Sequence, residues 1–152
     1  MEIRMMQAAD IPAVCSLLRQ VFDQALAPDY TQEGKQTFYA FIEEEAMRSR
    51  LSDGGFGLVA FVDGDLASQI ELRNNSHICL LFTKMEHQGK GLAKALVEQA
   101  LQICKERDKK VAAVSVNAAL SAVTAYTHLG FKQSSAEQER NGIRYVPMIR
   151  LL

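Results

Sequence analysis

The chain has little net charge, no long apolar run and few cysteines, and each of these limits what it can do. Its 152 residues include 17 Lys or Arg and 18 Asp or Glu, for a formal net charge of −1. This balance gives no general field to attract nucleic acid or an anionic membrane. No apolar run approaches the ~20 residues of a membrane span, and no basic-then-apolar signal segment stands at the N-terminus. The sequence therefore predicts a cytoplasmic protein with neither a nucleic acid nor a membrane as partner.

The cysteines are too few and too widely spaced for a disulfide framework or a metal site. Cys15, Cys79 and Cys104 are odd in number and lie in apolar surroundings. They predict buried thiols in a reducing compartment, and no metal. Cys79 falls on a predicted central strand, but no His is placed in the sequence to activate it, so a covalent relay through this thiol is disfavoured.

Length, turns and periodicity predict one domain over residues 1–152. Nearly half of the residues are hydrophobic, which is enough for a substantial core. Asp10 is expected to cap the first helix, and the pairs Asp63-Gly64, Asn74-Asn75 and Asn141-Gly142 predict turns between strands. The predicted strands are 2–5, 58–62, 66–72, 77–83, 111–116, 131–136 and 143–151, and the predicted helices are about 11–22, 34–50, 91–107 and 121–129.

This order of elements predicts the fold class. It reads β-α-α-β-β-β-α-β-α-β-β, an α/β (α+β) arrangement with a mixed, mostly antiparallel central sheet and helices on both faces. The middle strands form an antiparallel meander. The strand–helix–strand unit that follows implies a right-handed parallel crossover.

A glycine-rich turn precedes the longest helix and indicates an anion site. After strand 77–83 the chain reads Gln88-Gly89-Lys90-Gly91-Leu92-Ala93. Glycines let the backbone approach a ligand, and the free N–H groups and dipole of a helix start favour an anion. A P-loop is excluded because no Lys-Ser or Lys-Thr pair follows. A dinucleotide fingerprint is incomplete because Lys94 stands where its third glycine would be.

The pattern of Gln88, Gly91 and Ala93 resembles the coenzyme A-binding turn of the GNAT superfamily of N-acetyltransferases. Ala122, Tyr126 and Gly130-Phe131 resemble the second cofactor segment of that family, and residues 137–148 are similar to the tail of small bacterial members. One position departs from the pattern: Ala119 stands where many members have Asn.

The resemblance implies acetyl-CoA as cosubstrate, with its pantetheine arm in a split between strands 77–83 and 111–117. It implies cofactor contacts at Leu81, Phe82, Thr83, Gln88, Gly89, Lys90, Gly91, Leu92, Ala93, Asn117, Ala122 and Tyr126. It also implies that Tyr126 donates a proton to the departing thiolate, for which a phenol with a pKa near ~10 is suited. The alternative for Tyr126 is a core aromatic with a wet hydroxyl.

The general base stays open between Glu71, His77 and ordered water. A substrate ammonium must lose a proton before it attacks a thioester, and both residues lie on predicted central strands. Glu71 shares a strand face with Gln69 and Arg73, which is alternatively a solvated face. The N-terminal helices form the substrate wall in this family; here they carry the aromatics Tyr30, Phe38, Tyr39 and Phe41 and the carboxylates Glu43, Glu44 and Glu45, which suit an amine. The glutamate run is alternatively an exposed helix face.

The sequence thus predicts an acyltransferase that moves acetyl from acetyl-CoA to a primary amine by direct attack in a ternary complex. The acceptor is a small molecule or a peptide, and no metal takes part. A homodimer is common in the family, although no residue here demonstrates one. The alternatives are a non-catalytic acyl-CoA-binding sensor domain and, third, a nucleotide-binding module that uses the same turn.

Overall fold

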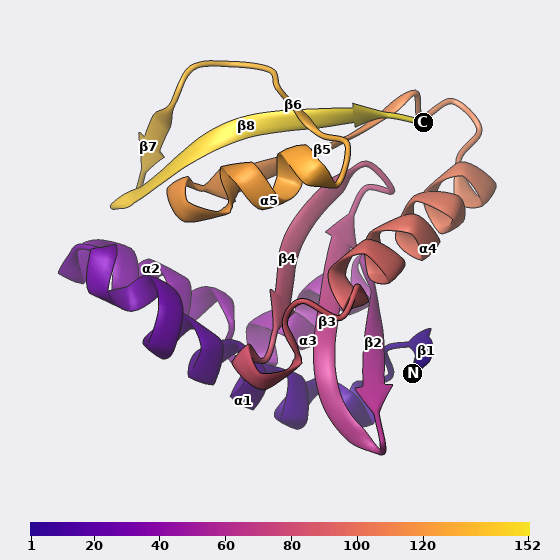
Figure 1. Cartoon of the computed structure of the whole chain (residues 1–152), viewed down its shortest axis with the longest axis horizontal. Coiled ribbons are helices and arrows are strands. Elements are labelled where there is room, and N and C mark those ends of the chain that lie inside the picture. Colours follow the sequence, from indigo (N-terminus) through magenta and orange to yellow (C-terminus); the bar gives the residue numbers. More distant parts are fainter.

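The computed structural model describes all residues, 1–152, and forms one eight-stranded sheet (Figure 1). The strand order is β1-β2-β3-β4-β5-β8-β6, with β7 paired to β8. Only the β4–β5 pair is parallel, so the predicted mixed and mostly antiparallel sheet is confirmed. The strands are β1 (Glu2–Met5), β2 (Phe56–Val62), β3 (Asp65–Arg73), β4 (His77–Thr83), β5 (Ala113–Ala119), β6 (Lys132–Gln133), β7 (Gln138–Arg140) and β8 (Ile143–Leu151).

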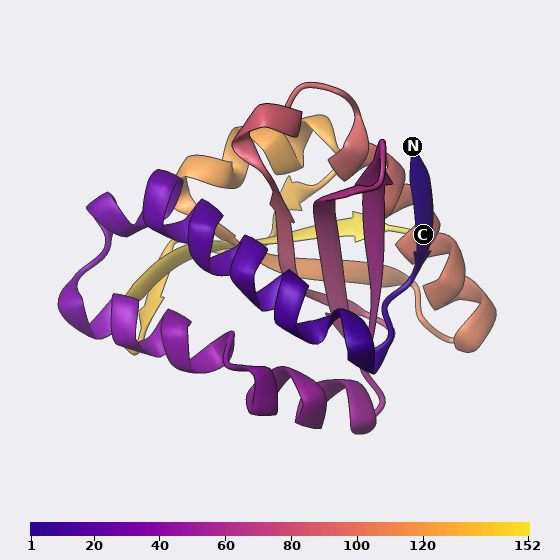
Figure 2. The same cartoon turned by 90° about the horizontal axis from the view of Figure 1, so that it is seen from below.

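Helices cover both faces of this sheet, as predicted (Figure 2). They are α1 (Ile11–Val21), α2 (Gln32–Phe41), α3 (Glu44–Ser52), α4 (Leu92–Arg107) and α5 (Val123–His128). The first three lie on one face, and α4 and α5 lie on the other. None of them is both long and apolar enough to cross a membrane.

The sheet separates two hydrophobic cores. Along β2, Leu58 and Ala60 belong to the core under α4, whereas Val59 between them belongs to the core under α1. This alternation follows from the pleat of a strand, which sends successive side chains to opposite faces. A strand with both faces covered therefore reads as a continuous apolar run, as Phe56–Val62 does.

The three predicted turns are present. Asn141 and Gly142 both have positive φ, 52° and 82°, as do Asp63 and Gly64 at 50° and 79°. Tight hairpin turns with positive φ at both central positions select Asn, Asp and Gly, which is why these pairs could be recognised in the sequence.

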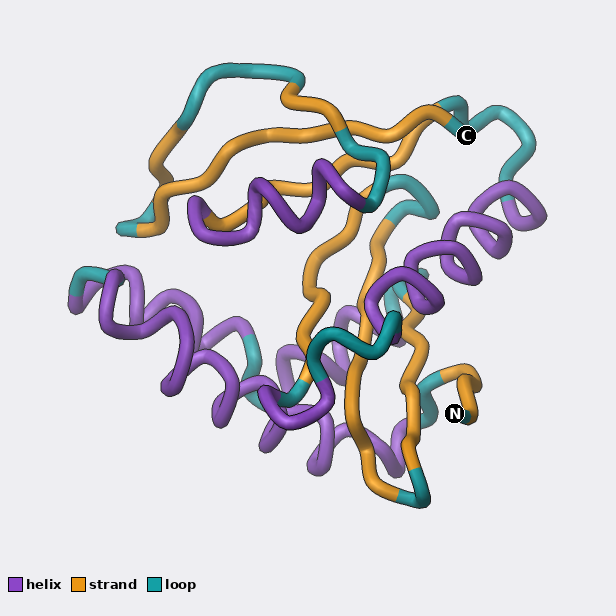
Figure 3. Tube along the Cα trace, viewed as in Figure 1, coloured by secondary structure: helices purple, strands orange, loops and turns teal.

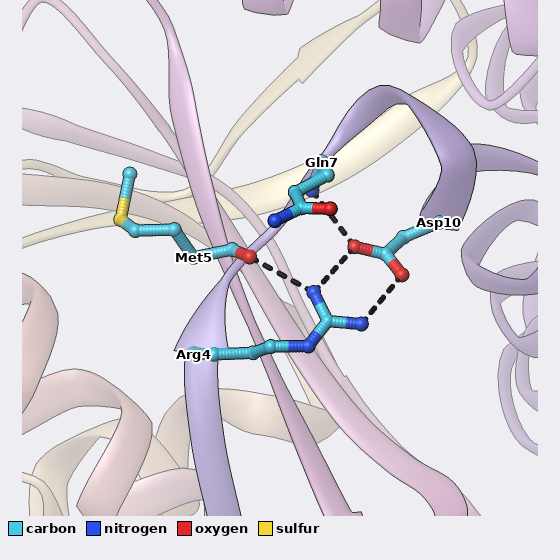
Figure 4. A network of polar contacts seen from close by, with 4 residues as sticks. All are labelled: Arg4, Met5, Gln7 and Asp10. Atoms are coloured by element: carbon cyan, nitrogen blue, oxygen red, sulfur yellow. Dashed lines mark hydrogen bonds and ion pairs between the residues drawn. The ribbon is translucent and has the colours of Figure 1, made fainter.

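Asp10 does not cap α1, which corrects the sequence prediction (Figure 4). Its carboxylate accepts two hydrogen bonds of 2.8 Å from the Arg4 guanidinium and one of 2.8 Å from the Gln7 N–H. The pairing with Arg4 lowers the pKa of the Asp10 carboxyl. The residue therefore ties β1 to the short 3₁₀ turn at Ala8–Asp10 that precedes α1.

Two predicted elements are divided in the structure. The helix expected over 34–50 breaks at Ile42 and Glu43 into α2 and α3, and Met47 in α3 is fully buried. Phe41, expected on the inner face, is 37% exposed. The strand expected over 131–136 pairs only at Lys132 and Gln133, because the chain then leaves the sheet and returns as β7.

Candidate active site

The central feature of the site is a split between β4 and β5. These parallel strands pair only at His77 with Ser115 and Ile78 with Val116, although β4 continues to Thr83. Beyond Ile78, the edge of β4 that faces β5 has no partner strand. Unpaired backbone groups of this kind can bind an extended ligand as an additional strand.

A β-bulge at Cys79 accounts for the split. Leu72 pairs with Ile78 and Glu71 with Leu80, so Cys79 is an extra residue in β4. The bulge reverses the alternation of the strand, since Ile78 packs in the core under α4 while Leu80 packs in the core under α1. Bulges bend the strand that carries them. The bend directs the second half of β4 away from β5.

A cavity of about 710 Å³ extends through the split. At one end it is bounded by the end of β4, the loop before α4, and the segment 121–129, which contains α5. At the other end it is bounded by α2, the start of β4 and the β7–β8 hairpin. Of its 35 lining residues, 21 are hydrophobic. Its size and apolar lining are typical of a small-molecule site.

The glycine-rich turn of the predicted anion site lies at the start of α4. In Figure 3 the loop after β4 leads directly into the first turn of this helix. Gly89 and Gly91 have φ of 78° and 82°, and the first internal hydrogen bond of the helix runs from the Ala95 N–H to the Gly91 carbonyl at 3.1 Å. The N–H groups of residues 92–94 therefore have no partner within the helix, and the glycine before them has no side chain to cap them. Lys94 adds a positive charge to this turn, so an anion is favoured here.

Most of the predicted cofactor-binding residues line this one cavity. They are Leu81, Phe82, Thr83, Gln88, Gly89, Gly91, Leu92, Ala93, Asn117, Ala122 and Tyr126. Lys90 is the exception and does not line the cavity, although its Nζ lies 3.2 Å from Nδ1 of His87, which does. His87 in turn bonds Asp65 through Nε2 at 2.9 Å.

Tyr126 of α5 lines the cavity. The residue is 8% exposed, and its ring packs edge-on against Phe131 with the centroids 5.5 Å apart. No protein group forms a hydrogen bond with the hydroxyl. Burial raises the pKa of this phenol well above its usual range. Tyr126 is therefore protonated at neutral pH and has a proton to donate.

His77 lies at the closed end of the split and is neutral. Its Nδ1 is 2.8 Å from the Ser115 hydroxyl, and that hydroxyl donates to the Ser76 carbonyl at 3.3 Å. With the Ser115 hydroxyl donating to Ser76, the assigned tautomer has the ring proton on Nδ1 and a lone pair on Nε2. Burial, with a smaller contribution from the charge of Arg73, lowers the pKa of His77 to about 4. The ring can accept a proton at neutral pH, but it is a weak base.

Glu71, the other candidate base, does not line the cavity. It is fully buried and forms a bidentate ion pair with Arg50 of α3, at 2.6 Å from Nε to Oε2 and 3.0 Å from Nη2 to Oε1. The interpretation of its strand face as solvated is wrong for Gln69 and Glu71, which are both fully buried. Arg73, at the end of the strand, is exposed.

Cys79 also lines the cavity, as a free and half-buried thiol. Burial raises its pKa to about 11, so the thiol stays protonated at neutral pH. A protonated thiol is a poor nucleophile. Of the other cysteines, Cys104 is buried as predicted and Cys15 is half-buried.

Only part of the predicted substrate wall faces the cavity. Tyr30, Phe38 and Phe41 line it. Tyr39 does not, since its hydroxyl donates to Asp23 at the surface. The glutamates at 43–45 lie in a separate shallow depression beside α1 and are exposed. No carboxylate of the predicted wall therefore reaches the cavity.

The contacts that close this end of the cavity could not be recognised in the sequence. The β7–β8 hairpin is clasped to α2, with the Thr37 hydroxyl donating to the Asn141 carbonyl at 2.7 Å and the Thr31 hydroxyl to the Gly142 carbonyl at 3.3 Å. The backbones are so close that a Cβ on Gly34 would lie 2.5 Å from the Gly142 oxygen. The Asn141-Gly142 turn was visible in the sequence, but its docking on α2 was not.

A mixed sheet opened between two parallel strands, with a glycine-rich helix start at the opening, is the arrangement that the resemblance to acetyltransferases implied. The chain belongs to the GNAT acetyltransferase family, because residues 26–152 match the profile described as "Acetyltransferase (GNAT) domain". No curated protein matches the sequence.

Solved structures share the fold at low sequence identity. A GCN5-related N-acetyltransferase from Rhodopseudomonas palustris has a TM-score of 0.85 at 19% identity, with 99% of this chain and 95% of that chain covered. The PaiA N-acetyltransferase of Thermoplasma acidophilum, determined in complex with coenzyme A, has a TM-score of 0.78 at 20% identity, with both chains fully covered. A ribosomal-protein-alanine N-acetyltransferase from Brucella melitensis has a TM-score of 0.70 at 18% identity, again with both chains fully covered.

Proposed function

We propose that this protein transfers an acetyl group from acetyl-CoA to a primary amine by direct attack in a ternary complex. The observation that carries the proposal is the continuity of one cavity, which joins the anion-binding turn, the unpaired edge of β4 and the hydroxyl of Tyr126. Membership of the GNAT family supports it.

The cavity suits coenzyme A along its length. The pyrophosphate would bind the N–H groups of the turn and first helical residues, 89–94, where Lys94 adds positive charge. The pantetheine arm would pair with the free edge of β4 near Leu81 and Thr83. None of the residues that line the cavity is Asp or Glu, so no carboxylate opposes the phosphates. The Thermoplasma relative was determined with coenzyme A bound, which supports the same ligand here.

Two residues, Tyr126 and His77, would carry out the proton transfers of the reaction. The thioester supplies an activated acetyl carbonyl, which the amine nitrogen attacks while the bond to sulfur breaks. Tyr126 would donate a proton to the departing sulfur. His77 would accept the amine proton at Nε2, directly or through a water. We assign Glu71 to holding Arg50, because its carboxylate is buried in that ion pair. Cys79, as a protonated thiol, is left out of the pathway.

The test is release of free thiol from acetyl-CoA in the presence of a panel of amines, with the product identified by mass spectrometry. Tyr126→Phe should lose activity, and Tyr39→Phe, outside the cavity, serves as the matched control. Acetyl-CoA binding without thiol release for any amine would reject the transferase and favour the sensor alternative. Absence of acetyl-CoA binding would reject both.

A further inference from the structure

The charges that line the cavity are all of one sign. The lining includes Arg50, Arg73, Lys94 and Arg140, together with His77 and His87, but no Asp or Glu. The whole chain has a formal net charge of −1, so this imbalance is local and not a property of the protein surface in general. A cavity lined by one sign of charge selects ligands of the opposite sign.

Coenzyme A accounts for only part of this positive charge. Lys94 lies in the first turn of α4 and belongs to the phosphate cradle. The three arginines lie beside the other end of the cavity: Arg50 of α3 bonds the Phe41 carbonyl of α2, Arg73 pairs with His77 at the start of β4, and Arg140 ends β7. These arginines therefore lie at the same end of the cavity as the aromatic side chains of the predicted substrate wall.

Of these three, Arg50 is already neutralised. Its guanidinium donates to both oxygens of Glu71 and to the Phe41 carbonyl at 2.7 Å, and it stacks on the Phe41 ring at 3.8 Å. Arg73 and Arg140, in contrast, form no ion pair with any group of the chain. Two arginines without a counter-charge thus line this end of the cavity.

The backbone positions of Arg73 and Arg140 are fixed by the fold, and both side chains are exposed. Arg73 pairs in strand register with His77, and its charge contributes to the lowered pKa of that ring, so its field reaches the closed end of the split. Arg140 directly precedes Asn141, whose carbonyl is fixed to α2 by Thr37. The clasp of the hairpin on α2 therefore also positions Arg140.

We infer that the acceptor is a small amine that also bears a carboxylate, such as an amino acid, and that Arg73 and Arg140 bind this carboxylate. The inference rests on the proposed acetyl transfer for its first half, the amine. A guanidinium binds a carboxylate through two parallel hydrogen bonds, which gives orientation as well as affinity. Polyamines, which carry only positive charge, would be repelled by the same residues.

The test compares amines that differ only in the carboxylate: phenylalanine with phenethylamine, and lysine with cadaverine, with phosphoethanolamine as the arm for a phosphate-bearing acceptor and spermidine as the polycation. The wild-type protein should prefer each amino acid over its decarboxylated partner by at least about tenfold in kcat/KM. Arg73→Gln and Arg140→Gln should each raise KM for the amino acid about tenfold and change that for the plain amine less than twofold. Arg144→Gln, an exposed arginine outside the cavity, is the matched control.

A preference for the plain amines, for spermidine or for phosphoethanolamine would overturn the inference, as would arginine variants that affect both members of a pair equally. The same ligands are also tested by thermal shift with coenzyme A present. A stabilisation by the amino acid that Arg73→Gln removes supports the site even without turnover, in which case only the proposed transfer fails. Equal shifts with both members of a pair overturn the carboxylate site itself.

Discussion

Replacing Arg50 by methionine tests whether Glu71 is structural. The substitution leaves the carboxylate of Glu71 with no partner at a position that is fully buried. Removing one member of a buried ion pair costs about 3–5 kcal/mol, because the other charge is then neither hydrated nor paired. For a domain of this size, each kcal/mol lowers Tm by about 2–4 °C, so the expected fall is about 6–20 °C.

The assay is thermal unfolding followed by circular dichroism at pH 7, with Arg48→Met as the control. Arg48 also pairs with a glutamate, Glu45, but the two side chains are 44% and 87% exposed. Breaking an exposed pair of this kind costs less than about 1 kcal/mol. If Arg50→Met unfolds within about 2 °C of wild type, the ion pair does not stabilise the fold. A stable Glu71→Gln variant that loses kcat would return Glu71 to the role of base.

Three further predictions concern the cavity. Tyr126→Phe should lower kcat by about 10–10³-fold without lowering Tm, since the hydroxyl has no protein partner to lose; a variant with full kcat would exclude Tyr126 as the proton donor. Gly91→Ala places a Cβ in the anion cradle and should weaken acetyl-CoA binding about tenfold, measured by calorimetry. It should also destabilise the fold by ~1–2 kcal/mol, because a side chain is strained at positive φ. Gly54→Ala, at a φ of 89° outside the cavity, should destabilise the fold by a similar amount and leave the affinity unchanged. The pKa of His77 is lowered from 6.5 to about 4, so the unfolded chain binds the proton first as pH falls. The free energy of unfolding should therefore decrease by about 1–2 kcal/mol between pH 6.5 and 4, after allowing for partial exposure of the ring, and His77→Asn should lack this part of the decrease in urea titrations.

The fold could be predicted because its signals are local. The turns at Asp63-Gly64 and Asn141-Gly142 require positive φ, and in each case two adjacent residues are enough to predict the turn. The break between α2 and α3 could not be predicted in the same way. Ile42 and Glu43 carry no turn signal, and the two helices that they separate pack in a core built largely from other elements.

The site, too, could be predicted only where its signals are local. The anion cradle lies within one short segment, so its glycines and the helix that follows could be read together. Glu71 was interpreted from its own strand, but its role depends on Arg50, 21 residues earlier in the chain. The acceptor end depends on contacts such as Thr37 with Asn141, which are 104 residues apart. No periodicity or spacing reports a contact of that kind.

The most direct test of the account is a thermal shift with acetyl-CoA, coenzyme A, ATP and NADH, each at about 100 times a plausible Kd. Binding at that saturation stabilises the folded state by about 2.7 kcal/mol, which corresponds to a rise in Tm of about 5–11 °C for a domain of this size. We expect this rise with acetyl-CoA and coenzyme A and none with ATP or NADH. No rise with either coenzyme A ligand would contradict the proposal that the cavity binds coenzyme A.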